Sequence, residues 1–365
     1  MVEMRLYEYD PDYVVAPGEI LEETLGVRNI KKVDLAQRCG LSPKTVSQII
    51  SGKAPITPET AIQLERVVGV SANIWNNLEA NYRLFRAKQS LRQELSKYVG
   101  WTRKFPVMEL IYRGLIRDKD NPGEIVEQLI DFFGVGSVQA WEEKFGQLQV
   151  SFRCSPAFQS SRESVATWLR IGELCSEKVS CNPYNKTQFI KALSNIRTLT
   201  PEQPEVFEPR MREICADAGV ALAFVGELPG THLSGATRWV GKAKALIMLS
   251  LRHKSDDHFW FSFFHEAGHI LFGGKKSVFL DEMNAWIDPE EEKANRFASD
   301  ILIPRQAYTA FLDKEIYTYS SVQSFAQTLG IAPGIVVGRL QHDGVISWQS
   351  LNSLKRKFEL IEACD

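Results

Sequence analysis

The feature that most constrains this chain is one short run of metal-ligating residues, His265-Glu266-Ala267-Gly268-His269. If the run is helical, its two imidazoles lie four residues apart on one face and can bind the same cation. Glu266 then lies next to that cation, where its carboxylate can act as a general base toward water. Because phenylalanine and tryptophan residues surround the run, burying these polar groups without a cation would be costly. The chain therefore needs a helix, a metal site and an apolar core around both.

The surrounding sequence predicts that helix and a second one after it. The first runs from about Asp256 to Phe272 and is apolar on almost every side, and the second runs from about 289 to 303. Zinc in a peptidase needs a third protein ligand and one open position. No histidine follows His269 at the metzincin spacing, so a carboxylate from the second helix is the expected donor. The small Gly268 would let a substrate backbone approach the first helix.

Three consecutive glutamates at the start of the second helix are candidates for the third ligand. Glu291 projects along the inward stripe of that helix, Glu290 fits this stripe less well, and Glu292 points aside. The stripe itself consists of Ala294, Phe297, Ala298 and Ile301. Spacing thus favours Glu291 and leaves Glu290 open.

Two apolar runs rich in β-forming residues, 220–225 and 245–251, precede the metal-binding helix. They predict two or three strands, which could bind an extended peptide as an added strand. Helical patterns dominate the rest of the chain. The predicted fold class is therefore α+β, mostly α, with a small β-sheet beside the helix that carries the HExxH motif.

The first 92 residues read as five short helices that include a helix-turn-helix. Ser42-Pro43 and Thr57-Pro58 each pair an N-cap residue with a proline at the first helical position. Gly40 supplies the turn before the helix from Ser42 to Ile50, which would enter the major groove of DNA.

The side chains of this predicted recognition helix suit contacts with bases. Lys44 and Gln48 share one face and can donate to guanine and adenine respectively, with Thr45 and Ser47 beside them. Residues 28–53 hold six basic groups against one acid, a net of +5 in a chain of −2. Such a local excess is typical of a surface that contacts phosphates. The expected phosphate contacts are Arg28, Lys31, Lys32, Arg38 and Lys53.

A second stretch repeats the turn of this motif 290 residues later. Residues 325–336 align with residues 35–46, and alanine, glutamine, glycine, proline and valine recur in register. The positions of Lys44, Thr45 and Gln48 hold glycine or isoleucine in the later copy. We therefore expect the second copy to pack or to bind protein, and not to read DNA.

The N-terminal residues also carry a family resemblance. The stretches Pro17-Gly18-Glu19-Ile20-Leu21, residues 41–61 and Ile74-Trp75-Asn76-Asn77-Leu78 resemble the HigA-type antitoxins of the Xre helix-turn-helix family. The resemblance covers about the first quarter of the chain. It implies a homodimer that binds its own promoter as operator DNA and neutralises a cognate toxin.

The C-terminal part resembles another family, the ImmA/IrrE metallopeptidases. The resemblance rests on Ser234-Gly235-Ala236, on the HExxH run, and on Glu291-Glu292-Lys293-Ala294-Asn295-Arg296-Phe297-Ala298. It implies a gluzincin-like site in which zinc (Zn2+) is held by His265, His269 and Glu291. It also implies a cytosolic peptidase that cleaves a transcriptional regulator. No oxyanion stabiliser is singled out, although His232, Arg238, His258 and Tyr308 are candidates.

The remaining features set boundaries and compartment. We expect a helix-turn-helix domain at 1–92, a helical middle region at 93–204, a zincin-like peptidase domain at 205–311 and a helical extension at 312–365. The six cysteines form no CxxC pair, so reduced thiols are expected. No apolar run is long enough to cross a membrane, and we expect a cytoplasmic protein.

Two functions follow from these observations. The first is a DNA-binding regulator whose zinc peptidase cuts itself or a partner repressor. The second is an antitoxin or autorepressor whose zinc domain is a non-catalytic sensor or toxin-binding scaffold.

Overall fold

The computed structural model describes residues 13–119, 121–146, 161–250, 252, 254–273, 279–280 and 289–359. Contacts between Cα atoms divide the chain into two compact units. Unit 1 consists of residues 1–99 and 120–127, and unit 2 of residues 100–119 and 128–365. The four-part division expected from the sequence stays a prediction.

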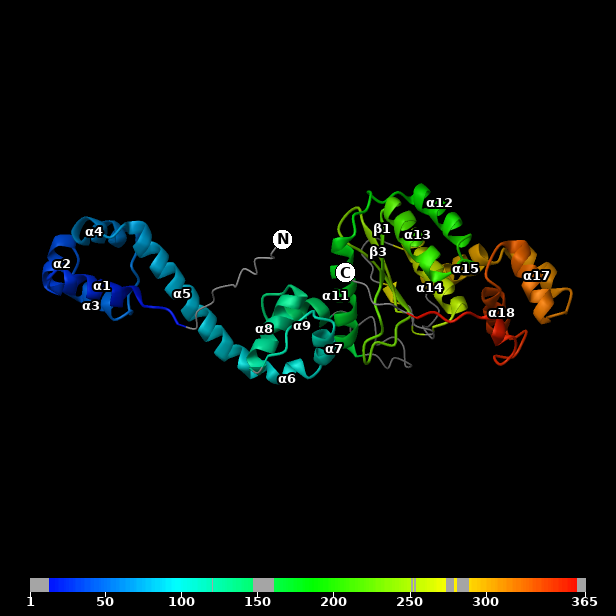
Figure 1. Ribbon diagram of the computed structural model, residues 1–365, viewed down its shortest axis with the longest axis horizontal. Coiled ribbons are helices and arrows are strands. Elements are labelled where there is room, and N and C mark those ends of the chain that lie inside the picture. Colours follow the sequence, from blue (N-terminus) through cyan, green and yellow to red (C-terminus); the bar gives the residue numbers. More distant parts are fainter. Residues whose placement is uncertain are drawn as a thin grey trace, which may run out of the picture. The chain divides into compact units, whose positions relative to one another are not determined.

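Unit 1 contains the five helices expected in the first 92 residues (Figure 1). In chain order they are α1 (Pro17–Val27), α2 (Lys32–Cys39), α3 (Pro43–Ile50), α4 (Pro58–Val68) and α5 (Ala72–Leu95). The predicted start of α3 is present, since the Ser42 hydroxyl accepts from the backbone N–H of Thr45 at 3.0 Å. Leu35, Ala61 and Trp75 are fully buried and form part of one apolar core. The helix-turn-helix is thus held by a core of its own.

Three helices lie at or next to the positions where the chain passes from one unit to the other. They are η1 (Ser96–Tyr98), α6 (Val99–Thr102) and α8 (Pro122–Phe133). The other helices of unit 2 before the sheet are α7 (Val107–Tyr112), α9 (Val138–Gly146), α11 (Arg162–Lys178), α12 (Lys186–Arg197) and α13 (Pro204–Asp217). Those after it are α14 (Asp256–Phe272), α15 (Pro289–Leu302), α16 (Arg305–Leu312), α17 (Tyr319–Leu329), α18 (Pro333–His342) and η2 (Asn352–Leu354). None of the described helices is both long and apolar enough to cross a membrane.

A small mixed sheet lies at the centre of unit 2. Its strands are β1 (Val220–Phe224), β2 (Gly235–Trp239), β3 (Ala245–Leu249) and β4 (Phe279–Leu280), in the order β1-β3-β2-β4. β1 runs parallel to β3, whereas β2 is antiparallel to both β3 and β4. The predicted α+β, mostly helical fold class is confirmed.

The sheet separates two layers of helices, with α11 on one face and α13 and α14 on the other (Figure 1). On the α11 side, Gly172 lets the helix approach, because a Cβ there would lie 2.2 Å from Sδ of Met248. On the α14 side, Leu222 and Ile247 join a core with Trp260. The metal-binding helix is therefore packed directly on the sheet.

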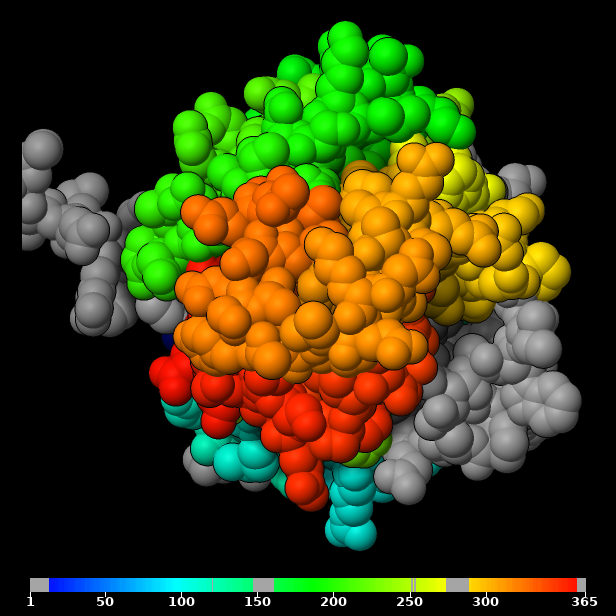
Figure 2. Space-filling model, turned by 90° about the vertical axis from the view of Figure 1, so that its right-hand side faces the viewer, coloured from blue at the N-terminus to red at the C-terminus, as the bar shows by residue number. Residues whose placement is uncertain are grey.

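The C-terminal helix α18 shares the apolar core of the metal-binding helix. Val336 and Leu340 of α18 are fully buried in the same core as α14. Figure 2 looks onto this end of unit 2, where α16 and α17 (orange) are exposed at the surface.

The expectation of reduced thiols holds for Cys39, Cys181 and Cys215 but fails for Cys175, which is disulfide-bonded.

Candidate metal centre and nucleic-acid interface

The structure brings three of the predicted site residues together at the contact of α14 and α15. One ligand atom from each of His265, His269 and Glu291 lies within 4.8 Å of the others. The two Nε2 atoms are 3.0 Å apart, and the Glu291 carboxylate oxygens lie 3.3 Å from His265 Nε2 and 3.2 Å from His269 Nε2. Two imidazoles and one carboxylate are a donor set typical of zinc. These side chains could hold a metal ion.

The approach of α15 explains how Glu291 reaches the two histidines. A Cβ on Gly268 would lie 3.0 Å from Cα of Ala294, one turn beyond Glu291. A larger residue would push the helices apart and withdraw the carboxylate. The sequence suggested that Gly268 makes room for substrate, whereas the structure shows that it makes room for α15.

Neighbouring groups affect the orientation of the His265 ring and the pKa of Glu291. Nδ1 of His265 lies 2.8 Å from Oδ1 of Asn295, which can accept a hydrogen bond from Nδ1, while Nε2 faces the other ligands. Burial alone would raise the pKa of Glu291, but hydrogen bonds from His265 and His269 and their charge lower it to about 2. Glu291 is therefore an anion at neutral pH. The contact of Asn295 with His265 was not predicted, although the position of Asn295 four residues after Glu291 places both on one face.

Glu266 is fully buried and faces β2, away from solvent. The Thr237 hydroxyl donates to Oε2 of Glu266 at 2.5 Å. Gly235 allows this contact between helix and strand, because a Cβ there would lie 2.6 Å from Oε1 of Glu266. The strand thus orients the carboxylate that the sequence assigned as general base. Gly235 belongs to a run that carries the family resemblance, but the contacts of Gly235 and Thr237 with Glu266 were not foreseen, since only the sheet brings these residues to α14.

The remaining candidate site residues, Glu292 and the candidate oxyanion stabilisers, are not part of the cluster of metal ligands. Glu292 is exposed and pairs with Arg296 at 2.5 Å, in agreement with its outward direction. Among the candidate oxyanion stabilisers, Tyr308 donates to Asp343 at 2.9 Å and Arg238 pairs with Glu173. His258 lies two turns before His265 on α14, and His232 lies three residues before the start of β2.

In unit 1 the predicted base-contacting residues line the exposed side of α3. Lys44 and Ser47 are exposed, and Gln48 is half-buried. Thr45 is also half-buried, and its hydroxyl lies 2.8 Å from that of Ser42. Thr45 therefore helps to cap the helix as well as lying beside the predicted contact surface.

The five predicted phosphate contacts, Arg28, Lys31, Lys32, Arg38 and Lys53, are all exposed. Two of them make exposed ion pairs, Lys32 with Glu22 at 2.5 Å and Arg38 with Asp34 at 2.8 Å. Such exposed pairs contribute little and exchange readily for other partners.

Comparison with protein families matches each unit separately. Residues 28–75 match the helix-turn-helix family, and residues 227–341 match a peptidase family described as the IrrE N-terminal-like domain. A relative in Escherichia coli K12, the uncharacterized HTH-type transcriptional regulator YddM, is 36% identical over 75 residues and 80% of its length is covered. The chain belongs to the helix-turn-helix family.

A second relative of this helix-turn-helix protein matches over a similar length. Virulence-associated protein I of Dichelobacter nodosus is 36% identical over 76 residues, which make up 20% of this chain and 70% of that protein. The E. coli match likewise covers 20% of this chain. Each of these two relatives is therefore matched over about a fifth of the chain.

Solved structures similar to the chain include two proteins named HigA. An addiction module antidote protein of the HigA family from Coxiella burnetii has 30% identity over 23% of this chain and 91% of that chain, with a TM-score of 0.21. The antitoxin HigA of Pseudomonas aeruginosa with the higBA promoter has 32% identity over 22% and 90%, with a TM-score of 0.22. By the two family matches, the chain combines an N-terminal helix-turn-helix domain with an IrrE-like peptidase domain.

Proposed function

We propose that this protein is a DNA-binding regulator whose C-terminal domain hydrolyses a peptide bond in the protein itself or in a partner repressor, with zinc as the metal. The observation that carries the proposal is the meeting of His265, His269 and Glu291 beside the buried Glu266. Three protein ligands leave one position open, which is typical of a catalytic site and not of a structural one.

In the proposed hydrolysis the side chains of the site would bind the metal, transfer a proton or position another group. His265, His269 and Glu291 would hold zinc, which when bound supplies a Lewis acid for a peptide carbonyl. Glu266 would accept a proton from the attacking water and deliver it to the departing amine. Thr237 holds the Glu266 carboxylate in place through its hydroxyl. Asn295 holds the ring of His265.

In the same proposal unit 1 binds the operator of its own promoter. Lys44 and Gln48 would contact bases, flanked by Thr45 and Ser47. Arg28, Lys31, Lys32, Arg38 and Lys53 would contact phosphates. The protein would act in the cytoplasm as a homodimer, as dimeric repressors bind two half-sites related by symmetry.

The test uses the full chain and one substitution. Purified protein should contain about one zinc per chain, as a single three-ligand site requires. Glu266→Gln should keep zinc and operator binding but lose cleavage of the protein or of a co-expressed repressor. Metal-free protein, or cleavage that persists in the variant, would contradict the assignment.

A second candidate is an antitoxin or autorepressor whose metal domain does not turn over and binds a cognate toxin. The resemblance of residues 17–21, 41–61 and 74–78 to HigA-type antitoxins favours it. Under this candidate, Glu266→Gln and the unchanged protein repress the promoter equally at every stage of growth. Derepression that depends on Glu266 would decide for the peptidase.

A further inference from the structure

A pocket in unit 2 is lined partly by α14, the helix that carries two of the metal ligands, but contains none of these ligands. Its free volume is small, about 10 Å³, and it is partly open to solvent. Its lining combines apolar walls with hydroxyl and basic groups. The lining residues are Ser234, Leu249, Arg252, Lys254, Ser255, His258, Phe259 and Ser262. We call it the basic pocket.

The polar lining suits an anion. Arg252, Lys254 and His258 are basic, and three serines add hydroxyl donors. None of the lining residues is an acid. Guanidinium, ammonium and hydroxyl groups that converge on one space bind carboxylates through charge-assisted hydrogen bonds. Leu249 and Phe259 would pack against the methylene groups that carry such a carboxylate.

Nearby acids are engaged by other cations. Asp256 pairs with Arg356 at 3.2 Å, and Asp257 pairs with Lys355 at 2.6 Å. Asp257 also lies 4.0 Å from Nε2 of the pocket residue His258. Glu227 lies 3.7 Å from Nε of Arg252 and partly offsets its charge. Lys254 makes no side-chain ion pair with any residue in the described part of the chain, and its ammonium is thus the charge most available to a ligand.

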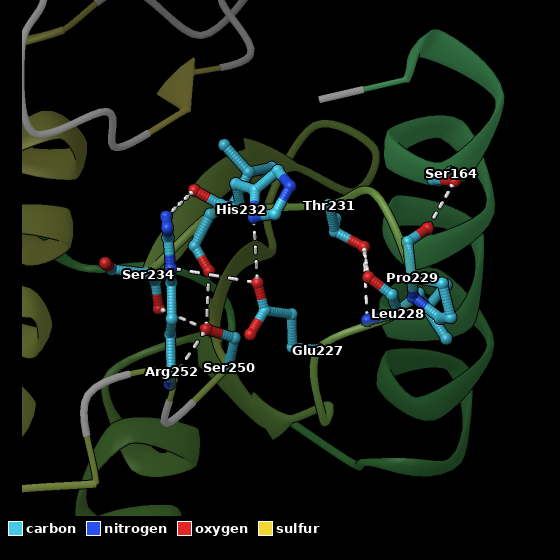
Figure 3. Close-up of polar contacts among 10 residues, drawn as sticks. Ser164, Glu227, Leu228, Pro229, Thr231, His232, Ser234, Ser250 and Arg252 are labelled. Atoms are coloured by element: carbon cyan, nitrogen blue, oxygen red, sulfur yellow. Dashed lines mark hydrogen bonds and ion pairs between the residues drawn. The ribbon is translucent and has the colours of Figure 1, made fainter. Parts of the chain in front are cut away.

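Figure 3 shows how Arg252 is held at the pocket. Its guanidinium points toward the carbonyl of His232 and the carboxylate of Glu227, and donates to that carbonyl. Ser234 and Ser250 lie beside it (Figure 3). His232 and Lys254 both have positive φ angles, 28° and 51°. Left-handed backbone at residues other than glycine is uncommon, so the surroundings must hold these two turns in place.

The basic pocket and the metal ligands share one stripe of α14. His258, Ser262, His265 and His269 follow one another at spacings of four, three and four residues, which places them on one face. From His258 to His265 the helix rises by about 10 Å, a distance that an extended peptide covers in roughly three residues. Ser234 links the two sites on the other side, since the next residue, Gly235, contacts Glu266.

We propose that the basic pocket binds a carboxylate of the peptide substrate, about three residues from the bond that is cut. The inference rests on the proposed peptidase function and names its substrate class, an acidic peptide. The carboxylate is either an acidic side chain or the free C-terminus of the peptide, since both present the same group to the pocket.

The test is cleavage of a mixed peptide library by the full-length zinc protein, with the products sequenced. Glutamate and aspartate should be enriched roughly tenfold near the third position from the cut bond, as expected for a charge-assisted contact. Lys254→Glu should reverse this preference to lysine and arginine. A misfolded variant cannot produce such a reversal. Lys191→Gln, an exposed lysine on α12, is the matched control and should keep the acidic preference.

A parallel measurement separates the inference from the peptidase function. Labelled peptides that differ only in one glutamate or glutamine are titrated onto the Glu266→Gln protein, each with a free or an amidated C-terminus. Preference for glutamate in amidated peptides assigns the side chain, and preference for a free C-terminus assigns the terminal carboxylate. If nothing is cleaved but either preference is present, the pocket stands and the peptidase proposal fails. Cleavage without acidic preference, or a preference unchanged in Lys254→Glu, overturns the pocket.

Discussion

The two copies of the helix-turn-helix pattern, α2–α3 and α17–α18, have nearly the same local geometry and different surroundings. The first helix of each ends at a left-handed glycine, Gly40 or Gly330, both with φ of 65°. The backbone N–H of the residue after this glycine donates across the turn, from Leu41 to the carbonyl of Ala36 at 2.8 Å and from Ile331 to the carbonyl of Ala326 at 3.1 Å. The turn is therefore determined by local sequence in both copies.

The second helices differ in what they present. α3 exposes Lys44 and Ser47, whereas α18 buries Gly334 and Val337 at the corresponding positions. Gly334 lies against α14, because a Cβ there would be 2.2 Å from Oδ1 of Asp256. The match to the IrrE-like family runs to residue 341 and so includes most of α18. The same turn thus serves one helix that faces solvent and one that supports the metal-binding helix.

The largest effect is expected where the C-terminal segment supports α14. Arg356 pairs with the fully buried Asp256 and also donates to the carbonyls of Pro201 and Glu202. Arg356→Ala leaves a buried carboxylate unpaired and should lower the free energy of unfolding by about 3–5 kcal/mol. Chemical denaturation measures it, with Arg296→Ala, whose partner Glu292 is exposed, as control. Equal stability of the two variants would mean that α14 does not depend on this support.

Loss of base contacts comes next. Lys44→Ala with Gln48→Ala should weaken specific operator binding by roughly 2–6 kcal/mol, since each of the two base contacts contributes about 1–3 kcal/mol. The fold should be unaffected, because Lys44 is exposed. A mobility-shift assay at fixed salt compares operator and random DNA. Undiminished specificity would show that α3 and α18 do not differ in the way proposed.

The matching change in the second copy should affect stability and not DNA. Gly334→Ala places a methyl group against a carboxylate that is itself held by Arg356, and should cost about 2 kcal/mol by overpacking. Operator affinity per folded molecule should stay the same. Thermal denaturation and a mobility-shift assay on one preparation provide both values, and a stable variant with weakened DNA binding would refute the comparison.

The smallest effect concerns how the two helices begin. α3 is capped by its own Ser42, whereas α18 has no side-chain cap and the N–H of Ala332 instead donates to Thr200 at 3.3 Å. Ser42→Ala should therefore cost about 1 kcal/mol, and hydrogen exchange of the full chain should show it in α3. Thr200→Val should affect α17–α18 instead. If either variant lowered the hydrogen-exchange protection of both α3 and α17–α18, the two copies would not be held independently.

Much of the site could be predicted from local spacing. The HExxH spacing placed His265 and His269 on one face, and the stripe of α15 singled out Glu291 over Glu292. Cap and proline signals predicted the starts of α3 and α4, which the structure confirms. Helix periodicity and caps act over a few residues, so one sequence is enough to read them.

Other features depended on contacts between distant segments. The pairing of Glu266 with Thr237 requires β2 to lie against α14, and the strand order β1-β3-β2-β4 cannot be deduced from β-propensity. The use of Gly268 for helix packing and the burial of α18 also arise from neighbours that are remote in the sequence. By itself the sequence determined which helices form and which side chains each face carries. The tertiary structure decided what those faces meet, because burial and packing depend on residues that only the folded chain brings together.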